Sequence, residues 1–195
     1  DNITWEQAPL CPDVTSVAVN NLATNTATIN WEENLAIENW NIAIGAATET
    51  NPSSLPLLTS TTQGVYNATG LAANSNYKAW VRSVCGEDSG AWIGPIMFKT
   101  NCEPALTFNE NFDTTTVTNL PSCWTKIIRG VTVSTSAAVA TVALPNTQSG
   151  PNAVQLFNAN STGNYDIILV SPLMPQNLVN TSRVKFYAKS LTESS

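Results

Sequence analysis

The residues of this chain that could perform chemistry are its carboxylates and its cysteines. The sequence contains 14 Asp and Glu residues and four cysteines but no histidine. The lack of histidine excludes Ser-His-Asp and Cys-His catalytic arrangements, imidazole metal ligands and the usual general base at neutral pH. A glycosidase would need two carboxylates facing each other across a cleft, and no such pair stands out. The sequence therefore predicts that the chain is not an enzyme.

The four cysteines, Cys11, Cys85, Cys102 and Cys123, lack C-x-x-C spacing, and no histidine is present to complete a zinc site. Disulfides formed in an oxidising compartment are the better interpretation. Four cysteines allow three connectivities, so the choice depends on the strands that carry them.

One long predicted strand organises the first half of the chain. From Tyr77 to Cys85 the residues alternate, with Ala79 and Val81 on one face and Lys78, Trp80 and Arg82 on the other. A tyrosine that opens such a strand, six residues after Leu71 and just past a polar turn, is typical of a tyrosine corner. Its ring would pack in the core, and its hydroxyl would bond to the backbone upstream.

Six further short segments have the composition and alternation of strands. Together with the strand that Tyr77 opens, they make seven strands separated by turn residues, the pattern of an all-β, immunoglobulin-like sandwich. The predicted strands cover residues 14–19, 26–32, 40–44, 55–59, 64–69, 77–85 and 96–100.

This first half resembles a fibronectin type III domain. The likeness rests on Trp31 at the close of the second strand, on the Leu71 and Tyr77 pair, and on the final strand Gly94-Pro95-Ile96-Met97-Phe98-Lys99-Thr100. We assign residues 10–101 to this domain and residues 1–9 to a linker or the tail of a preceding module. In such a sandwich the start of the first strand and the end of the sixth lie at one pole. Because a disulfide needs Cα atoms within ~7 Å, Cys11 should pair with Cys85, which leaves Cys102 to pair with Cys123.

Residues 102–195 resemble the beginning of a second β-domain. The motifs Glu110-Asn111-Phe112-Asp113, Leu120-Pro121-Ser122-Cys123-Trp124 and Leu169-Val170-Ser171-Pro172 are similar to those of the MAM-like jelly-rolls in cleaved-adhesin and choice-of-anchor modules. That family also joins a cysteine near its first strand to one just before a tryptophan. Strands are predicted at 150–157, 167–173 and 184–189. A jelly-roll needs about eight strands, so we expect this one to be incomplete.

Two candidate binding surfaces follow. Trp80, flanked by Lys78 and Arg82 and with Met97 beside it, could stack on a sugar or contact a neighbouring module. The alternative, which we favour, is that the stems of Lys78 and Arg82 cover the indole. Glu110 and Asp113 could hold a structural Ca²⁺ ion, as related jelly-rolls do. They would need a bulge or loop to converge, because residues three apart on a strand face opposite ways.

Thr114 offers a candidate modification site. The short stretch Asp113-Thr114-Thr115 resembles the motif that is O-glycosylated in gliding-type bacteria.

The composition of the chain argues against some classes of partner. The net charge of −6 and the pI near 4.5 argue against nucleic acid and anionic membranes. Charged residues make up only 11% of the chain, and Asn, Thr and Ser supply the polarity instead, as in extracellular β-proteins. No apolar run is long enough to cross a membrane.

We therefore interpret the chain as a non-catalytic fragment of a large secreted protein at a bacterial cell surface. The resemblance implies export by the type IX route, a role in adhesion or surface attachment, and partners among surface proteins, glycans and neighbouring modules. Two alternatives stay open: an accessory binding module of a secreted peptidase or glycoside hydrolase, and a structural spacer.

Overall fold

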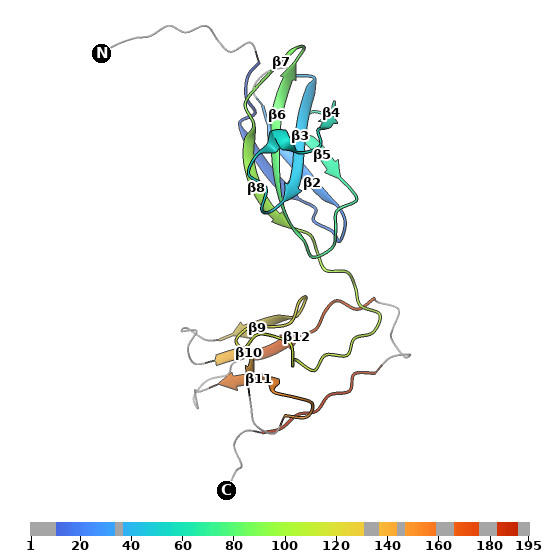
Figure 1. Ribbon diagram of the computed structural model, residues 1–195, viewed down its shortest axis with the longest axis vertical. Helices are drawn as coiled ribbons and strands as arrows, with labels where there is room; N and C mark the ends of the chain where they lie inside the picture. The colour runs from blue at the N-terminus through green and yellow to red at the C-terminus, as the bar shows by residue number, and fades with distance from the viewer. Residues whose placement is uncertain are drawn as a thin grey trace, which may run out of the picture. The chain divides into compact units, whose positions relative to one another are not determined.

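The chain divides into two compact units, unit 1 (Asp1–Glu103) and unit 2 (Pro104–Ser195), shown in Figure 1. The computed structural model describes residues 11–33, 37–130, 137–143, 147–158, 166–175 and 183–190. The regular secondary structure of these residues is β-strand throughout, apart from one 3₁₀ helix, η1 (Pro52–Ser54). No helix among the described residues is long and apolar enough to span a membrane. The predicted boundary, between residues 101 and 102, lies two residues before the division of the units.

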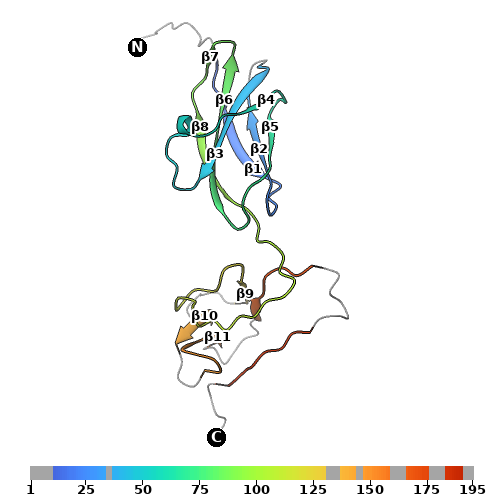
Figure 2. The same cartoon turned by 45° about the vertical axis from the view of Figure 1, so that its right-hand side comes forward.

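Unit 1 is a sandwich of two antiparallel sheets (Figures 1 and 2). One sheet has the order β1-β2-β5. The other has the order β4-β3-β6, and both β7 and β8 pair with β6. This is the immunoglobulin-like architecture that the turn spacing predicts. The strands are β1 (Ser16–Asn20), β2 (Ala27–Glu32), β3 (Asn39–Ala46), β4 (Leu58–Ser60), β5 (Val65–Ala68), β6 (Asn76–Cys85), β7 (Asp88–Ser89) and β8 (Ile93–Lys99).

The core of unit 1 lies between the two sheets. It is built from alternate residues of β2, β3 and β6, as the half-buried strand pattern requires. Ile29, Ile42 and Val81 are fully buried, and the rings of Trp31 and Trp40 pack with their centroids 5.5 Å apart. Burying a large apolar side chain stabilises the fold by about 1.5–3 kcal/mol, so these residues hold the sheets together.

Tyr77 forms the predicted tyrosine corner. Its ring stacks on Phe98 with centroids 5.5 Å apart, and its hydroxyl oxygen accepts a hydrogen bond from the Ala72 N–H at 2.8 Å. Leu71 packs against the same core, and its N–H donates to the Asn25 carbonyl at 3.0 Å. The corner therefore ties the connection before β6 to the turn before β2.

Unit 2 contains two antiparallel strand pairs, β9 (Thr125–Arg129) with β12 (Asp166–Val170) and β10 (Ala137–Ala143) with β11 (Asn152–Asn158). Strands β10 and β11 both pack against β12. Val139 and Thr141 of β10 are fully buried. Before β9, the rings of Phe108 and Phe112 each meet Trp124 edge-on, with centroids 5.4 Å away.

The prediction of a strand at residues 184–189 is wrong. Residues 183–190 have no regular secondary structure and are exposed throughout, and Phe186 retains 78% of its accessible surface. An isolated strand leaves its backbone groups without a ladder, and no strand that the structure describes pairs with this segment. The alternating pattern was therefore not sufficient to form a strand here.

Candidate functional site

Trp80 is buried, so its indole is covered, as we favoured from the sequence, and is not an open stacking platform. It alternates along β6 with the core residues Ala79 and Val81, so it lies on the outer face of its sheet, away from the core. Only 3% of its surface is accessible. No ligand can stack on a ring that is covered in this way.

Small residues on both sides make room for the indole. Its partner across the β3–β6 ladder is Ala43, which is fully buried. On the β8 side, a Cβ added to Gly94 would lie 3.0 Å from Trp80 Cδ1 and 2.7 Å from the Ala79 carbonyl oxygen. Gly94 has a φ of 132°, which also favours glycine. The ring therefore fits where a larger neighbour would displace it.

The two cations beside Trp80 have other contacts. Lys78 Nζ donates to the Glu49 carbonyl at 2.8 Å, in the loop after β3. The Arg82 guanidinium carbon lies 4.6 Å from the centroid of Trp92, within the range of a cation–π contact. The predicted cover of an indole by arginine thus occurs on Trp92. The sequence analysis did not single out Trp92, and its short distance along the chain from β6 was the available signal.

Met97 is the most accessible member of the predicted surface. It lies opposite Lys78 in the β6–β8 ladder and retains 69% of its accessible surface. Of the four residues predicted to bind a ligand, the structure leaves Met97 open and Lys78 and Arg82 half-buried.

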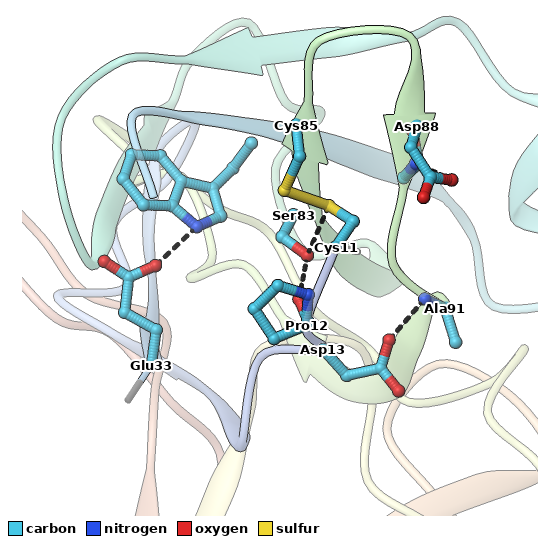
Figure 3. The surroundings of a disulfide bond; sticks show 10 residues. Cys11, Pro12, Asp13, Glu33, Ser83, Cys85, Asp88 and Ala91 are labelled. Carbon is cyan, nitrogen blue, oxygen red and sulfur yellow. Dashed lines mark hydrogen bonds between the residues drawn. A yellow bond between two sulfur atoms is a disulfide. The ribbon is translucent and has the colours of Figure 1, made fainter. Parts of the chain in front are cut away.

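The other constellation in unit 1 is the pole that carries the disulfide (Figure 3). Cys11 is bonded to Cys85, with Cα atoms 5.5 Å apart, as the strand order predicts. The Ser83 hydroxyl donates to the Pro12 carbonyl oxygen and lies 3.5 Å from Cys11 Sγ. The Asp13 carboxylate accepts from the Ala91 N–H at 2.5 Å. Residues 11–13 are therefore attached both to β6 and to the segment before β8.

The lack of a side chain at Gly90 leaves room for Ser83 and Asp13 at this pole. A Cβ at Gly90 would lie 2.5 Å from Ser83 Oγ and 2.8 Å from Asp13 Oδ1. Sequence reasoning did not identify Ser83 or Asp13. The available signal was a serine at an inward position of a core strand, because a buried hydroxyl needs a hydrogen-bond partner.

Cys102 and Cys123 are disulfide-bonded as well. Their pairing with each other stays a prediction.

A half-buried carboxylate lies near the disulfide pole, also in Figure 3. Glu33 Oε2 accepts a hydrogen bond from the Trp40 indole at 2.8 Å, and Oε1 is buried without a partner among the described residues. Its bond to the indole gives Glu33 a structural role at the end of β2.

Glu110 and Asp113, the residues predicted to hold Ca²⁺, have different hydrogen-bond partners. They lie in a loop, as convergence would require, but Glu110 Oε1 accepts from the Phe112 N–H at 2.7 Å. The Asp113 carboxylate instead lies against Gly150, and its Oδ1 accepts a hydrogen bond from the Asn152 N–H at 3.5 Å. Ca²⁺ takes 6–8 oxygen ligands, and the described residues contain no group of three or more acidic, Cys or His side chains placed for a metal. The calcium site at Glu110 and Asp113 stays a prediction.

Thr114 is exposed in the turn that follows Asp113. This position is accessible to a modifying enzyme, so O-glycosylation at Thr114 stays a prediction.

Comparisons with known proteins return fibronectin type III domains at low identity. No protein-family model matches the chain, and no curated protein matches it. Among solved structures, it is similar to an fn3 domain of human contactin 1, at 18% identity over 54% of this chain and 90% of that chain, with a TM-score of 0.46. It is also similar to the FN5 domain of Drosophila Lar, at 19% identity over 48% of this chain and 99% of that chain, with a TM-score of 0.41. An fn3 domain of the human collagen alpha-1(XX) chain matches at 13% identity over 55% of this chain and 100% of that chain, with a TM-score of 0.42.

Proposed function

We propose that the chain is a non-catalytic part of a secreted, multidomain cell-surface protein, in which it serves adhesion or surface attachment. The observation that carries the proposal is the disulfide-closed sandwich of unit 1, in which Cys11 and Cys85 join the first strand region to the end of β6. Disulfides persist in oxidising, extracellular surroundings. Sandwiches of the fibronectin type III kind are generally modules of multidomain proteins.

Within this proposal, unit 2 is the N-terminal part of a MAM-like jelly-roll. Its antiparallel pairs β9–β12 and β10–β11 and its aromatic cluster around Trp124 support that assignment. The same resemblance is our reason to propose a bacterial cell surface and export by the type IX route. Surface proteins, glycans and neighbouring modules of the same protein are the proposed partners.

The outer face of β6 and β8 is the proposed contact surface. Met97 is open there, and the Arg82–Trp92 stack lies on the same sheet. The burial of Trp80 removes one ring that could have stacked on a sugar, so the contacts that we propose are Met97 and the Arg82–Trp92 stack.

Adhesion of beads that carry the whole chain tests the proposal. The beads are passed over surfaces coated with glycans, with extracellular matrix proteins or with whole cells, and retention under flow is measured. We expect retention on at least one surface, and we expect Met97→Glu to abolish it. Leu57→Glu is the matched control, because Leu57 is also exposed, at 54%, but lies outside the described strands. Retention no greater than that of uncoated beads would contradict the adhesive role.

A further inference from the structure

The Cys11–Cys85 bond is a covalent connection through unit 1 that bypasses the chain between the two cysteines. The two cysteines are separated by 74 positions in the sequence. The chain enters unit 1 before Cys11 and leaves it after β8, so tension between the two ends passes from Cys11 directly to Cys85. The strands from β1 to most of β6 then lie in a closed loop that this tension does not stretch. Only the segment from Cys85 to the end of β8 stays in the path.

This path pulls β6 and β8 in opposite directions. The strands are antiparallel, and their register pairs Lys99 at the end of β8 with Asn76 at the start of β6. The load enters β6 at Cys85, its C-terminal end, and leaves β8 at Lys99, its own C-terminal end. The two strands are therefore pulled past each other along their length. Ladder hydrogen bonds run perpendicular to antiparallel strands, so several of them must break together before β8 can slide.

The exit from β8 is held as well. The Asn101 N–H donates to the Ala23 carbonyl at 2.9 Å, and Asn101 Nδ2 donates to the Leu22 carbonyl at 2.7 Å. Thr100 is 2% exposed, and its N–H donates to the Ser75 carbonyl at 3.1 Å. These bonds tie the end of β8 to the β1–β2 turn and to the corner before β6.

We propose that unit 1 is a load-bearing module whose Cys11–Cys85 bond diverts tension into the β6–β8 ladder and limits how far the module can extend. This role is independent of adhesion, because a spacer or an accessory module would use it equally. A sandwich without this disulfide would, on unfolding under tension, extend over the full length of the chain between its two ends.

Single-molecule pulling of the full chain, held at both termini, tests the proposal. Replacing both cysteines with serine (Cys11→Ser with Cys85→Ser) should lengthen the extension of unit 1 on unfolding by about 250 Å, at ~3.3–3.6 Å per released residue. The double variant Cys102→Ser with Cys123→Ser is the matched control, because it also removes two cysteines but leaves the path through unit 1 unchanged. An unaltered extension in the first variant would overturn the proposal.

A second measurement keeps the test independent of the folding of that variant. The native chain is held at constant force with or without dithiothreitol, a dithiol that supplies two electrons and two protons, becomes a cyclic disulfide and leaves Cys11 and Cys85 as thiols. We expect a short extension first, when unit 1 unfolds with the disulfide intact. A later step of about 250 Å should follow only when the dithiol is present, because the disulfide is then reduced. Full extension without the dithiol would show that the bond does not divert the load.

Discussion

Trp80 shows how one residue can be buried outside the core. It lies on the outer face of its sheet, yet only 3% of its surface is accessible, because Ala43 and Gly94 leave room for the ring. The residue therefore contributes packing energy on a face that usually meets solvent.

Trp80→Ala should consequently lower the free energy of unfolding by about 3–5 kcal/mol, the usual cost of truncating a buried aromatic side chain. Chemical denaturation of the whole chain measures this change. Met97→Ala is the control from the same face, and we expect it to change the free energy by less than about 0.5 kcal/mol, since Met97 is 69% exposed. Equal effects of the two substitutions would contradict the burial of Trp80.

The hydroxyl of Tyr77 should make a measurable contribution of its own. Tyr77→Phe removes the acceptor of the Ala72 N–H bond, and a hydrogen bond of this kind contributes about 0.5–1.5 kcal/mol. Tyr66→Phe serves as the control, since the Tyr66 hydroxyl bonds to none of the residues that the structure describes. Thermal unfolding of both variants measures the difference, and a Tyr77→Phe midpoint equal to that of the native chain would argue against the corner bond.

The sequence predicted the face of each residue on β6 but not which neighbours cover it. Alternation depends on backbone geometry alone, so it placed Tyr77, Ala79 and Val81 inward correctly. Exposure depends on neighbours distant in sequence, and nothing near Trp80 in the sequence indicates the close approach of Gly94. For the same reason, the contact between Arg82 and Trp92 became evident only in the structure.

At the scale of elements, the disulfide is the main link between the first strand region and β6. In the chain-entropy account, closing a loop of this length destabilises the unfolded state by up to about 4.5 kcal/mol. The double variant Cys11→Ser with Cys85→Ser should lose a comparable free energy of unfolding. Denaturant titration measures it, and a loss much below about 1 kcal/mol would indicate that the hydrogen bonds of Pro12 and Asp13 already hold the pole closed.

In unit 2, Asn152 connects the start of β11 to the turn after Phe112. Its side-chain amide donates to the Asp113 and Thr115 carbonyls at 3.2 and 3.1 Å. Asn152→Ala should speed amide hydrogen exchange around residues 113–115, because about two hydrogen bonds are lost. Gln155→Ala, on the same strand, should leave that exchange unchanged. If both variants exchange like the native chain, the turn does not depend on Asn152.

Strands with large alternating residues were predicted well, and strands without them were missed. The predicted range 26–32 agrees with β2 to within a residue, but β10 was missed because its residues Ala137–Ala143 are mostly small. The segment 184–189 shows the opposite error. Its alternation is clear, but a strand also needs a neighbouring edge to complete its hydrogen bonds, which local sequence does not reveal.

At the scale of the whole molecule, charge is unevenly divided between the units. Unit 1 carries ten acidic and three basic residues, whereas unit 2 carries four acidic and five basic residues. The net negative charge of the chain therefore comes from unit 1. Its field repels polyanions, which supports proteins and glycans as the proposed partners.

We propose that the chain binds its partners without transforming them. The most direct test incubates the purified chain with a panel of peptides and glycans and follows both retention and cleavage of each member. We predict retention of some members and cleavage of none, since the chain has no histidine and its described carboxylates form no metal-binding group. Cleavage that disappears on one carboxylate substitution, with Glu33→Gln tested first because one Glu33 oxygen is buried without a partner among the described residues, would contradict the account.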